Sequence, residues 1–320
     1  MVKMSIVFQF VILIVGFVLL IKGADWFVDG ASGIADKFGI PQIIIGLTIV
    51  AFGTSAPEAA VSIAAAMKNS ADLAVGNVLG SNIMNILLIL GICALLTPVP
   101  VQKNTLKYEI PFVIAITVVL AILGIIGNEL TRVDGIILLL IFAGFFVYLV
   151  RAAKNGKTEE SEAPAKKKSV WVLIGLTLLG IVMIVAGSQF TVNSASAIAA
   201  KFGMGERLIG LTIVAFGTSL PELVTSAVAA KKGNADIAIG NIVGSNIFNI
   251  LFVLGITATI TNVAYGANFY LDSIVALAAA VLLLVTVLNK EHKIKRWGGV
   301  VMLASYAAYF VYLVGFSAQA

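Results

Sequence analysis

The chain alternates long apolar runs with short polar connections, and this pattern predicts membrane-spanning helices. A hydrocarbon core about 30 Å thick is crossed by about 20 apolar residues of helix. The runs that approach or exceed this length cover residues 5–21, 41–67, 73–96, 110–126, 135–150, 170–187, 206–230, 237–260, 270–288 and 297–316. The pattern therefore predicts an all-α integral membrane protein with ten transmembrane helices.

The second half of the chain repeats the first. Residues 46–92 and 210–256 are identical at 31 of 47 positions when the halves are shifted by 164 residues. Each half holds five predicted spans, and an odd number makes the second copy enter the membrane upside down. Inverted repeats of this kind build many secondary transporters. We therefore expect two inverted five-helix repeats, at 1–150 and 170–320, joined by a charged linker at 151–169.

The positive charges predict the orientation. If the central linker is cytoplasmic, 16 of the 21 Lys and Arg residues lie in cytoplasmic loops and five lie on the opposite side. Cytoplasmic loops of membrane proteins carry an excess of Lys and Arg. We expect a multi-pass protein of the cell membrane with a cytoplasmic linker and both termini outside.

Composition excludes several function classes. Hydrophobic residues make up 60% of the chain and charged residues 12%, against about 25% charged in an average soluble domain. This balance excludes a soluble enzyme, a nucleic-acid-binding domain and a disordered protein. The net charge of +5 comes mostly from loop residues, so the expected partner is the lipid bilayer and not nucleic acid.

Two carboxylates lie in the middle of predicted spans, Glu58 and Glu222, at equivalent positions of the two repeats. A charged side chain at the bilayer centre costs about 3 kcal/mol on insertion scales, so such residues are functional candidates. In an inverted repeat, equivalent mid-span positions converge near the midplane. The sequence therefore predicts a paired-carboxylate site.

Each glutamate follows a proline, in GTSAPE (53–58) and GTSLPE (217–222). Proline lacks an N–H, so the carbonyls of Gly53 and Gly217 lose their helical partner. We expect both helices to break here and to turn backbone carbonyls inward, because irregular backbone at membrane depth lines a cavity or is buried in protein.

A purely structural interpretation of the same residues is also available. Ser-x-x-Glu is the capping-box pattern, and both Ser55 with Glu58 and Ser219 with Glu222 fit it. That interpretation would leave two carboxylates in the membrane only to start helices, and we favour an ion site.

A second doubled motif is GNVLGSNIMN (76–85) and GNIVGSNIFN (240–249). Its Gly-x-x-x-Gly spacing allows close helix packing, and side chains spaced by four share one helix face. Asn residues in such a stripe can simply bond neighbouring helices. Because they lie next to the paired glutamates, we favour ion ligation for four of them: Ser81, Asn85, Ser245 and Asn249.

These ligands form an all-oxygen site. Carboxylate, carbonyl, hydroxyl and amide oxygens suit hard cations, and Ca²⁺ takes six to eight of them. Two glutamates neutralise one Ca²⁺ and also attract Na⁺, so competition for one pair of carboxylates gives a basis for exchange. No nucleotide, protease or cofactor motif is apparent, so we expect a transporter and not an enzyme, with Ca²⁺ and Na⁺ as transported ions. A cation channel is the less favoured alternative.

The doubled motifs resemble the α-repeats of the calcium/cation antiporter superfamily and are most similar to those of prokaryotic Na⁺/Ca²⁺ exchangers. The resemblance implies that spans 2, 3, 7 and 8 form the ion-binding core, while spans 1 and 6 slide across it. The ion ligands that it implies are Ala51, Thr54, Ser55, Glu58, Ser81, Asn85, Ala215, Thr218, Ser219, Glu222, Ser245 and Asn249. The alanines would contribute backbone carbonyl oxygens.

The amide at Asn249 refines this expectation. Some relatives, including K⁺-dependent exchangers, carry Asp there, whereas two amides at Asn85 and Asn249 leave a site charge of −2. We therefore expect K⁺-independent Na⁺/Ca²⁺ exchange, with H⁺/Ca²⁺ exchange as the alternative. The resemblance implies three Na⁺ for one Ca²⁺. Because both halves of the site lie in one chain, we expect a functional monomer.

Overall fold

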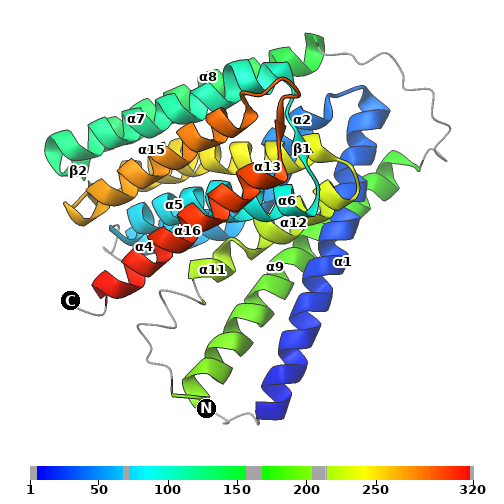
Figure 1. Cartoon of the computed structure of the whole chain (residues 1–320), viewed down its shortest axis with the longest axis horizontal. Coiled ribbons are helices and arrows are strands. Elements are labelled where there is room, and N and C mark those ends of the chain that lie inside the picture. Colours follow the sequence, from blue (N-terminus) through cyan, green and yellow to red (C-terminus); the bar gives the residue numbers. More distant parts are fainter. Residues whose placement is uncertain (1–5, 68–71, 156–167, 204–212, 214, 318–320) are drawn as a thin grey trace.

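The computed structural model describes residues 6–67, 72–155, 168–203, 213 and 215–317 (Figure 1). Within them the regular secondary structure is helical apart from four two-residue strands. Eight helices are long and apolar enough to cross a membrane: Ile6–Phe38, Leu73–Leu96, Thr105–Gly127, Arg132–Lys154, Val170–Lys201, Ala235–Ile260, Phe269–Val287 and Arg296–Gly315. The chain is a multi-pass all-α membrane protein.

The two remaining predicted spans are the ones that carry the glutamates. The first, 41–67, is a helix pair, Gln42–Thr54 and Ala56–Met67, bent by 49°. The second, 206–230, lies partly outside the described residues. Its described part consists of α11 (Ala215–Thr218) and α12 (Leu220–Lys231). The discontinuity expected near the prolines is therefore observed in both halves.

The predicted ends of spans 1 and 6 were wrong. Instead of 5–21 and 170–187, the structure has α1 (Ile6–Phe38) and α9 (Val170–Lys201). The polar residues Asp25 and Asp29 lie within α1 and do not terminate it. Both pair with Lys232, which follows α12, at Nζ–Oδ1 distances of 2.6 Å each. Burial lowers the pKa of Lys232, but the hydrogen bonds to the two carboxylates outweigh it and raise the pKa above its usual range.

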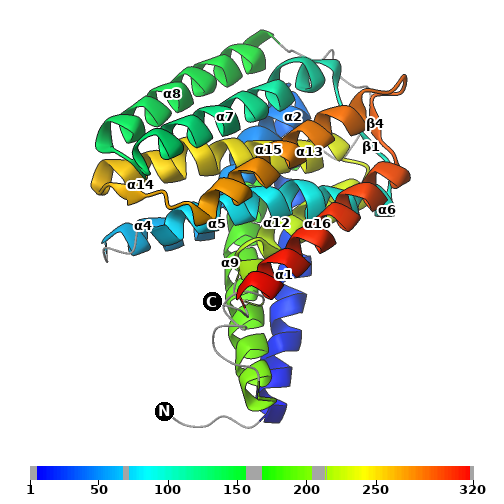
Figure 2. The same cartoon turned by 60° about the vertical axis from the view of Figure 1, so that its left-hand side comes forward.

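Helices α1 and α9 pack antiparallel along a glycine seam and cross the other helices obliquely (Figures 1 and 2). A Cβ atom added to Gly23 would lie 2.8 Å from the Cβ of Met183, and one added to Gly180 would lie 2.7 Å from the backbone nitrogen of Phe27. Small residues at such a seam let two backbones approach closely in lipid.

The other elements form a bundle whose centre is α13 (Ala235–Phe248), which is buried along almost its whole length. Three of the long helices contain a π-helical segment. The elements of the first half are α2 (Gln42–Ile45), η1 (Gly46–Val50), α3 (Ala51–Thr54), α4 (Ala56–Met67), α5 (Asp72–Met84), η2 (Asn85–Leu90), α6 (Gly91–Leu96), η3 (Thr105–Glu109), α7 (Ile110–Gly127) and α8 (Arg132–Asn155). Those of the second half are η5 (Asn249–Val253), α14 (Leu254–Ile260), α15 (Asn268–Val287) and α16 (Arg296–Ser317).

Two short antiparallel ladders join the halves at opposite ends of the bundle (Figure 1). One pairs β1 (Val99–Pro100) with β4 (Lys293–Ile294), and the other pairs β2 (Glu129–Leu130) with β3 (Val263–Ala264). Shifting the first ladder's strands by 164 residues gives those of the second, so equivalent segments of the two halves make reciprocal contacts.

Candidate functional site: two buried glutamates

The helix break has the same geometry in both halves. Ser55, between α3 and α4, has φ −85° and ψ 6°, and Ser219, between α11 and α12, has φ −90° and ψ 4°. Because Pro221 has no N–H, the Gly217 carbonyl lacks its helical partner and accepts a hydrogen bond from Ser188 Oγ of α9 at 2.8 Å. Helix α9 therefore contacts the break directly.

The break places Glu58 and Glu222 in the first turns of α4 and α12, where each is 1% exposed. Ser55 Oγ donates to Glu222 Oε1 at 2.7 Å, and Ser219 Oγ lies 3.5 Å from Glu58 Oε1. Each serine thus reaches the glutamate of the other half. The capping-box interpretation is not supported, because Ser219 makes no side-chain cap bond to α12.

Four carboxylate and amide oxygens at this site are buried and have no hydrogen-bond partner in the protein. They are Oε2 of Glu58, Oε2 of Glu222, Oδ1 of Asn85 and Oδ1 of Asn249. Leaving a buried acceptor unpaired costs about 1–3 kcal/mol, and more for a charged group. Two carboxylate and two amide oxygens match the ligands that hard cations prefer.

The other predicted ligands surround this group. Ser81 Oγ lies 3.5 Å from Ser219 Oγ, and Ser245 is fully buried beside Glu222. Thr218, at the end of α11, lies beside Glu58, and Ala215 begins α11.

Ala51 and Thr54 already have protein partners. The Ala51 carbonyl accepts the Ser55 N–H at 2.9 Å, so a cation bound there would share it. Thr54 Oγ1 donates to Asn241 Oδ1 at 2.9 Å.

The stripes expected on α5 and α13 divide by function. Asn77 and Asn241 each brace the helix pair of their own half, because their amide nitrogens donate to Ser62 Oγ at 3.0 Å and to Ser226 Oγ at 2.9 Å. Among the asparagines of the two stripes, only the last of each, Asn85 and Asn249, leaves a buried oxygen unpaired.

Sequence reasoning missed Asn82 and Asn246. Both are buried and contact the opposite half. They lie off the every-fourth-residue stripe, and the signal that could have found them is the Gly-Ser-Asn triplet present in both repeats.

Among the described residues, the equivalent glycines of α13 and α5 have different neighbours. A Cβ on Gly240 of α13 would lie 2.9 Å from the Cα of Gly46, and one on Gly244 would lie 2.8 Å from the Cα of Leu47, as the Gly-x-x-x-Gly spacing predicted. A Cβ added to the equivalent Gly80 of α5 would meet no heavy atom of the described residues within 4 Å, and the segment equivalent to Gly46–Val50, residues 210–214, lies largely outside the described residues. Gly80 lines a cavity of about 860 Å³ instead.

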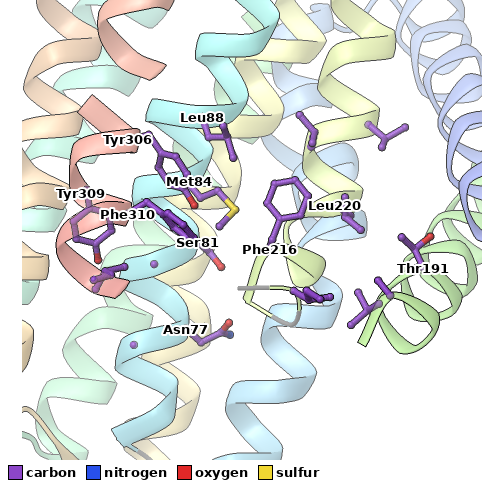
Figure 3. Close-up of a pocket in the computed structure, with 18 of the residues that line it drawn as sticks. Asn77, Ser81, Met84, Leu88, Thr191, Phe216, Leu220, Tyr306, Tyr309 and Phe310 are labelled. Carbon is purple, nitrogen blue, oxygen red and sulfur yellow. The ribbon is translucent and has the colours of Figure 1, made fainter. Parts of the chain in front are cut away.

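That cavity extends over Gly76 and Asn77 to Ser81. Figure 3 shows Ser81 on α5 facing Phe216 of α11 across it. Its walls are otherwise mostly apolar. One candidate ligand, Ser81, therefore lines this cavity.

The family described as sodium/calcium exchanger protein matches the chain twice, over residues 8–151 and 172–315. The chain belongs to this family. The two matched stretches are offset by 164 residues, the same shift as the internal repeat. The family is part of the calcium/cation antiporter superfamily.

Several relatives match the chain over nearly its whole length. The putative antiporter CaxA of Alkalimonas amylolytica is 44% identical, over 93% of this chain and 96% of its own length. The sodium/calcium exchanger MaX1 of Methanosarcina acetivorans is 32% identical, over 95% and 98%. A solved structure of the sodium-calcium exchanger NCX_Mj superposes with a TM-score of 0.84 at 33% identity, covering 97% of this chain and all of that one.

Proposed function

We propose that this protein is a secondary antiporter that exchanges Na⁺ for Ca²⁺ across the membrane. The observation that carries the proposal is the pair of buried glutamates, each bonded by a serine of the opposite half and each with one unpaired oxygen. Two carboxylates compensate one divalent cation or attract several Na⁺ ions, so the two ions compete for the same oxygens. The family and the names of its relatives agree with this chemistry.

The proposed ion ligands are the twelve residues that the sequence singles out around the helix breaks. Most of them lie within one buried cluster, where α3, α4, α5 and η2 of the first half meet α11, α12, α13 and η5 of the second. Carboxylate, amide, hydroxyl and carbonyl oxygens together would supply the six to eight contacts that Ca²⁺ takes. Histidine and methionine do not enter this ligand set, which fits a hard cation.

We propose that access alternates by movement of α1 and α9 across this cluster. Two observations support this: the glycine seam joins α1 and α9 closely, and Ser188 of α9 contacts the Gly217 carbonyl. The cavity extends along α5 toward its first residue, Asp72, at the end that the proposed topology places outside.

The proposed topology consists of ten spans in two inverted repeats, at 1–150 and 170–320, in the cell membrane, with the linker 151–169 cytoplasmic and both termini outside. The reciprocal ladders and the serine contacts that cross between the halves support a two-fold relation. One chain supplies a complete site, so we propose a functional monomer. With amides at Asn85 and Asn249, the proposed exchange is independent of K⁺ and moves three Na⁺ for one Ca²⁺.

Radiolabelled Ca²⁺ uptake into proteoliposomes tests the coupling. Vesicles holding the purified protein are loaded with Na⁺, K⁺ or a neutral osmolyte, or are given an outward H⁺ gradient. We expect rapid uptake only with internal Na⁺ and no stimulation by K⁺. Uptake driven by H⁺ alone would favour proton exchange, and uptake without any counter-ion would favour a channel.

A further inference from the structure

Four buried asparagines form a hydrogen-bonded ring across the two halves, which we call the asparagine clamp: Asn82, Asn85, Asn246 and Asn249. Asn82 Nδ2 donates to the backbone carbonyl of Asn246, and Asn246 Nδ2 donates to that of Asn82, both at 3.3 Å. The side-chain oxygens of the same two residues accept from the other pair. Asn249 Nδ2 donates to Asn82 Oδ1 at 3.2 Å, and Asn85 Nδ2 donates to Asn246 Oδ1 at 3.0 Å.

The asparagine clamp fixes which end of each amide is available to a cation. Asn82 and Asn246 use both ends of their amides within the protein. Asn85 and Asn249 use only the nitrogen, and their oxygens are buried and unpaired. An amide free to rotate would present N–H as readily as oxygen, and N–H repels a cation. Asn82 and Asn246, the outer pair, therefore hold Asn85 and Asn249, the inner pair, with their side-chain oxygens free to face a cation.

The asparagine clamp also constrains the charge of the site. Asn82 Oδ1 and Asn246 Oδ1 are acceptors, so the residue opposite each of them must donate. An ionised carboxylate at position 85 or 249 has no donor and would place two acceptors opposite each other. The amides at Asn85 and Asn249 are therefore matched by the outer pair, and this match keeps the site at two negative charges, from Glu58 and Glu222.

We propose that Asn82 and Asn246 are positioning residues for ion binding, acting across the two halves: Asn82 orients Asn249, and Asn246 orients Asn85. The inference rests on the proposed function, because it assumes that the inner amide oxygens bind the transported ions. The outer asparagines touch no ion themselves. Removing a partner that orients a metal ligand typically weakens metal affinity about 10- to 100-fold.

Equilibrium binding of radiolabelled Ca²⁺ to the purified full-length protein, with uptake measured in parallel, tests this. Asn82→Ala should raise the Kd for Ca²⁺ about tenfold or more, while uptake at saturating Ca²⁺ changes little. If Asn82→Ala does not give monodisperse protein, Asn82→Ser replaces it, because its short hydroxyl also lacks the reach to Asn249. If the wild type binds no Ca²⁺, the proposed function fails. If the wild type binds and both variants bind equally well, the positioning role is wrong.

Double-variant cycles supply a readout that a merely structural role would not give. If Asn82 acts through Asn249, then Asn82→Ala should add little to the Kd of Asn249→Ala, whereas it should still add its full effect to Asn85→Ala. By the same reasoning, Asn246→Ala should add little to the Kd of Asn85→Ala but should still add its full effect to that of Asn249→Ala. Coupling that is equal in all pairs, or stronger within a half, would overturn the assignment.

Discussion

Ser55 and Ser219 occupy the same position in the two repeats, and each contacts the glutamate of the other half. A local helix cap would have used the glutamate three residues along the chain. The crossed arrangement instead ties the two helix breaks to each other and leaves one oxygen of each carboxylate unpaired. At the level of single residues, the site is therefore built from partners about 160 positions apart in the sequence.

The first prediction concerns those carboxylates. Glu58→Gln and Glu222→Gln keep the side-chain size but remove one of the two charges that face the ion. Loss of one partner of a buried charge pair costs about 3 kcal/mol or more, which is about a 100-fold loss of affinity. We expect Na⁺-driven Ca²⁺ uptake to be nearly abolished in both variants.

Glu109 offers a matched control. It is also buried, at 3% exposed, and it also has one bonded and one unpaired oxygen, but it lies at the end of η3 and its hydrogen bond comes from Tyr148 of α8 and not from a serine of the site. Glu109→Gln should keep most of the wild-type uptake. Equal loss in all three variants would point to a general need for buried carboxylates and not to ion binding by the pair.

At the scale of elements, α1 is held to the end of α12 by Lys232. Its ammonium lies between Asp25 and Asp29, which are part of the helix that we propose moves. The equivalent positions on α9 are Gln189 and Asn193, which bond to each other at 2.8 Å. This ionic contact therefore has no charged counterpart on α9.

The second prediction tests that contact. Lys232→Gln should lower the thermal unfolding midpoint of the purified protein by a few degrees, because a partly exposed ion pair contributes about 1 kcal/mol or less. The neighbouring exposed Lys231→Gln is the control and should leave the midpoint unchanged. The difference should shrink in high salt, because salt screens exposed charges. Equal midpoints for both variants in low salt would show that the contact contributes nothing.

At the scale of the whole molecule, the two ladders mark opposite ends of the bundle and allow a test of topology. In a Cys93→Ala background, Lys290→Cys lies next to β4 and Ala264→Cys lies in β3, and both positions are exposed. An impermeant thiol reagent should label position 290 only from the cytoplasmic side and position 264 only from outside. Labelling of both from one side would show that α15 does not cross the membrane, and labelling of each from the opposite side would reverse the proposed orientation.

The last prediction concerns charge movement. Three Na⁺ for one Ca²⁺ moves one net positive charge, and one charge crossing 100 mV is worth about 2.3 kcal/mol. An inside-negative valinomycin potential imposed on Ca²⁺-loaded vesicles should therefore accelerate Na⁺-driven Ca²⁺ efflux and lower the final internal Ca²⁺. A two-for-one exchanger would ignore the potential, so an unchanged rate and final distribution would contradict the stoichiometry.

The sequence by itself determined the features that depend on local pattern or on duplication. Apolar runs marked the long helices, because lipid requires continuous apolar segments. Proline beside Glu58 and Glu222 marked the helix breaks, because a missing N–H acts within one turn. The ends of α1 and α9 escaped prediction, because at α1 the polar residues are compensated by Lys232, a partner about 200 positions away.

Only the tertiary structure decided which partners the polar groups take. The Gly-Ser-Asn triplets are identical in both repeats, so no local feature of the sequence predicts that Asn82 and Asn246 form hydrogen bonds to the opposite half. In the same way, the identical glycines have different surroundings among the described residues: Gly244 packs against Leu47, and Gly80 lines a cavity. Two near-identical segments can differ in this way because packing depends on how the surrounding helices are placed, and not on the segment alone.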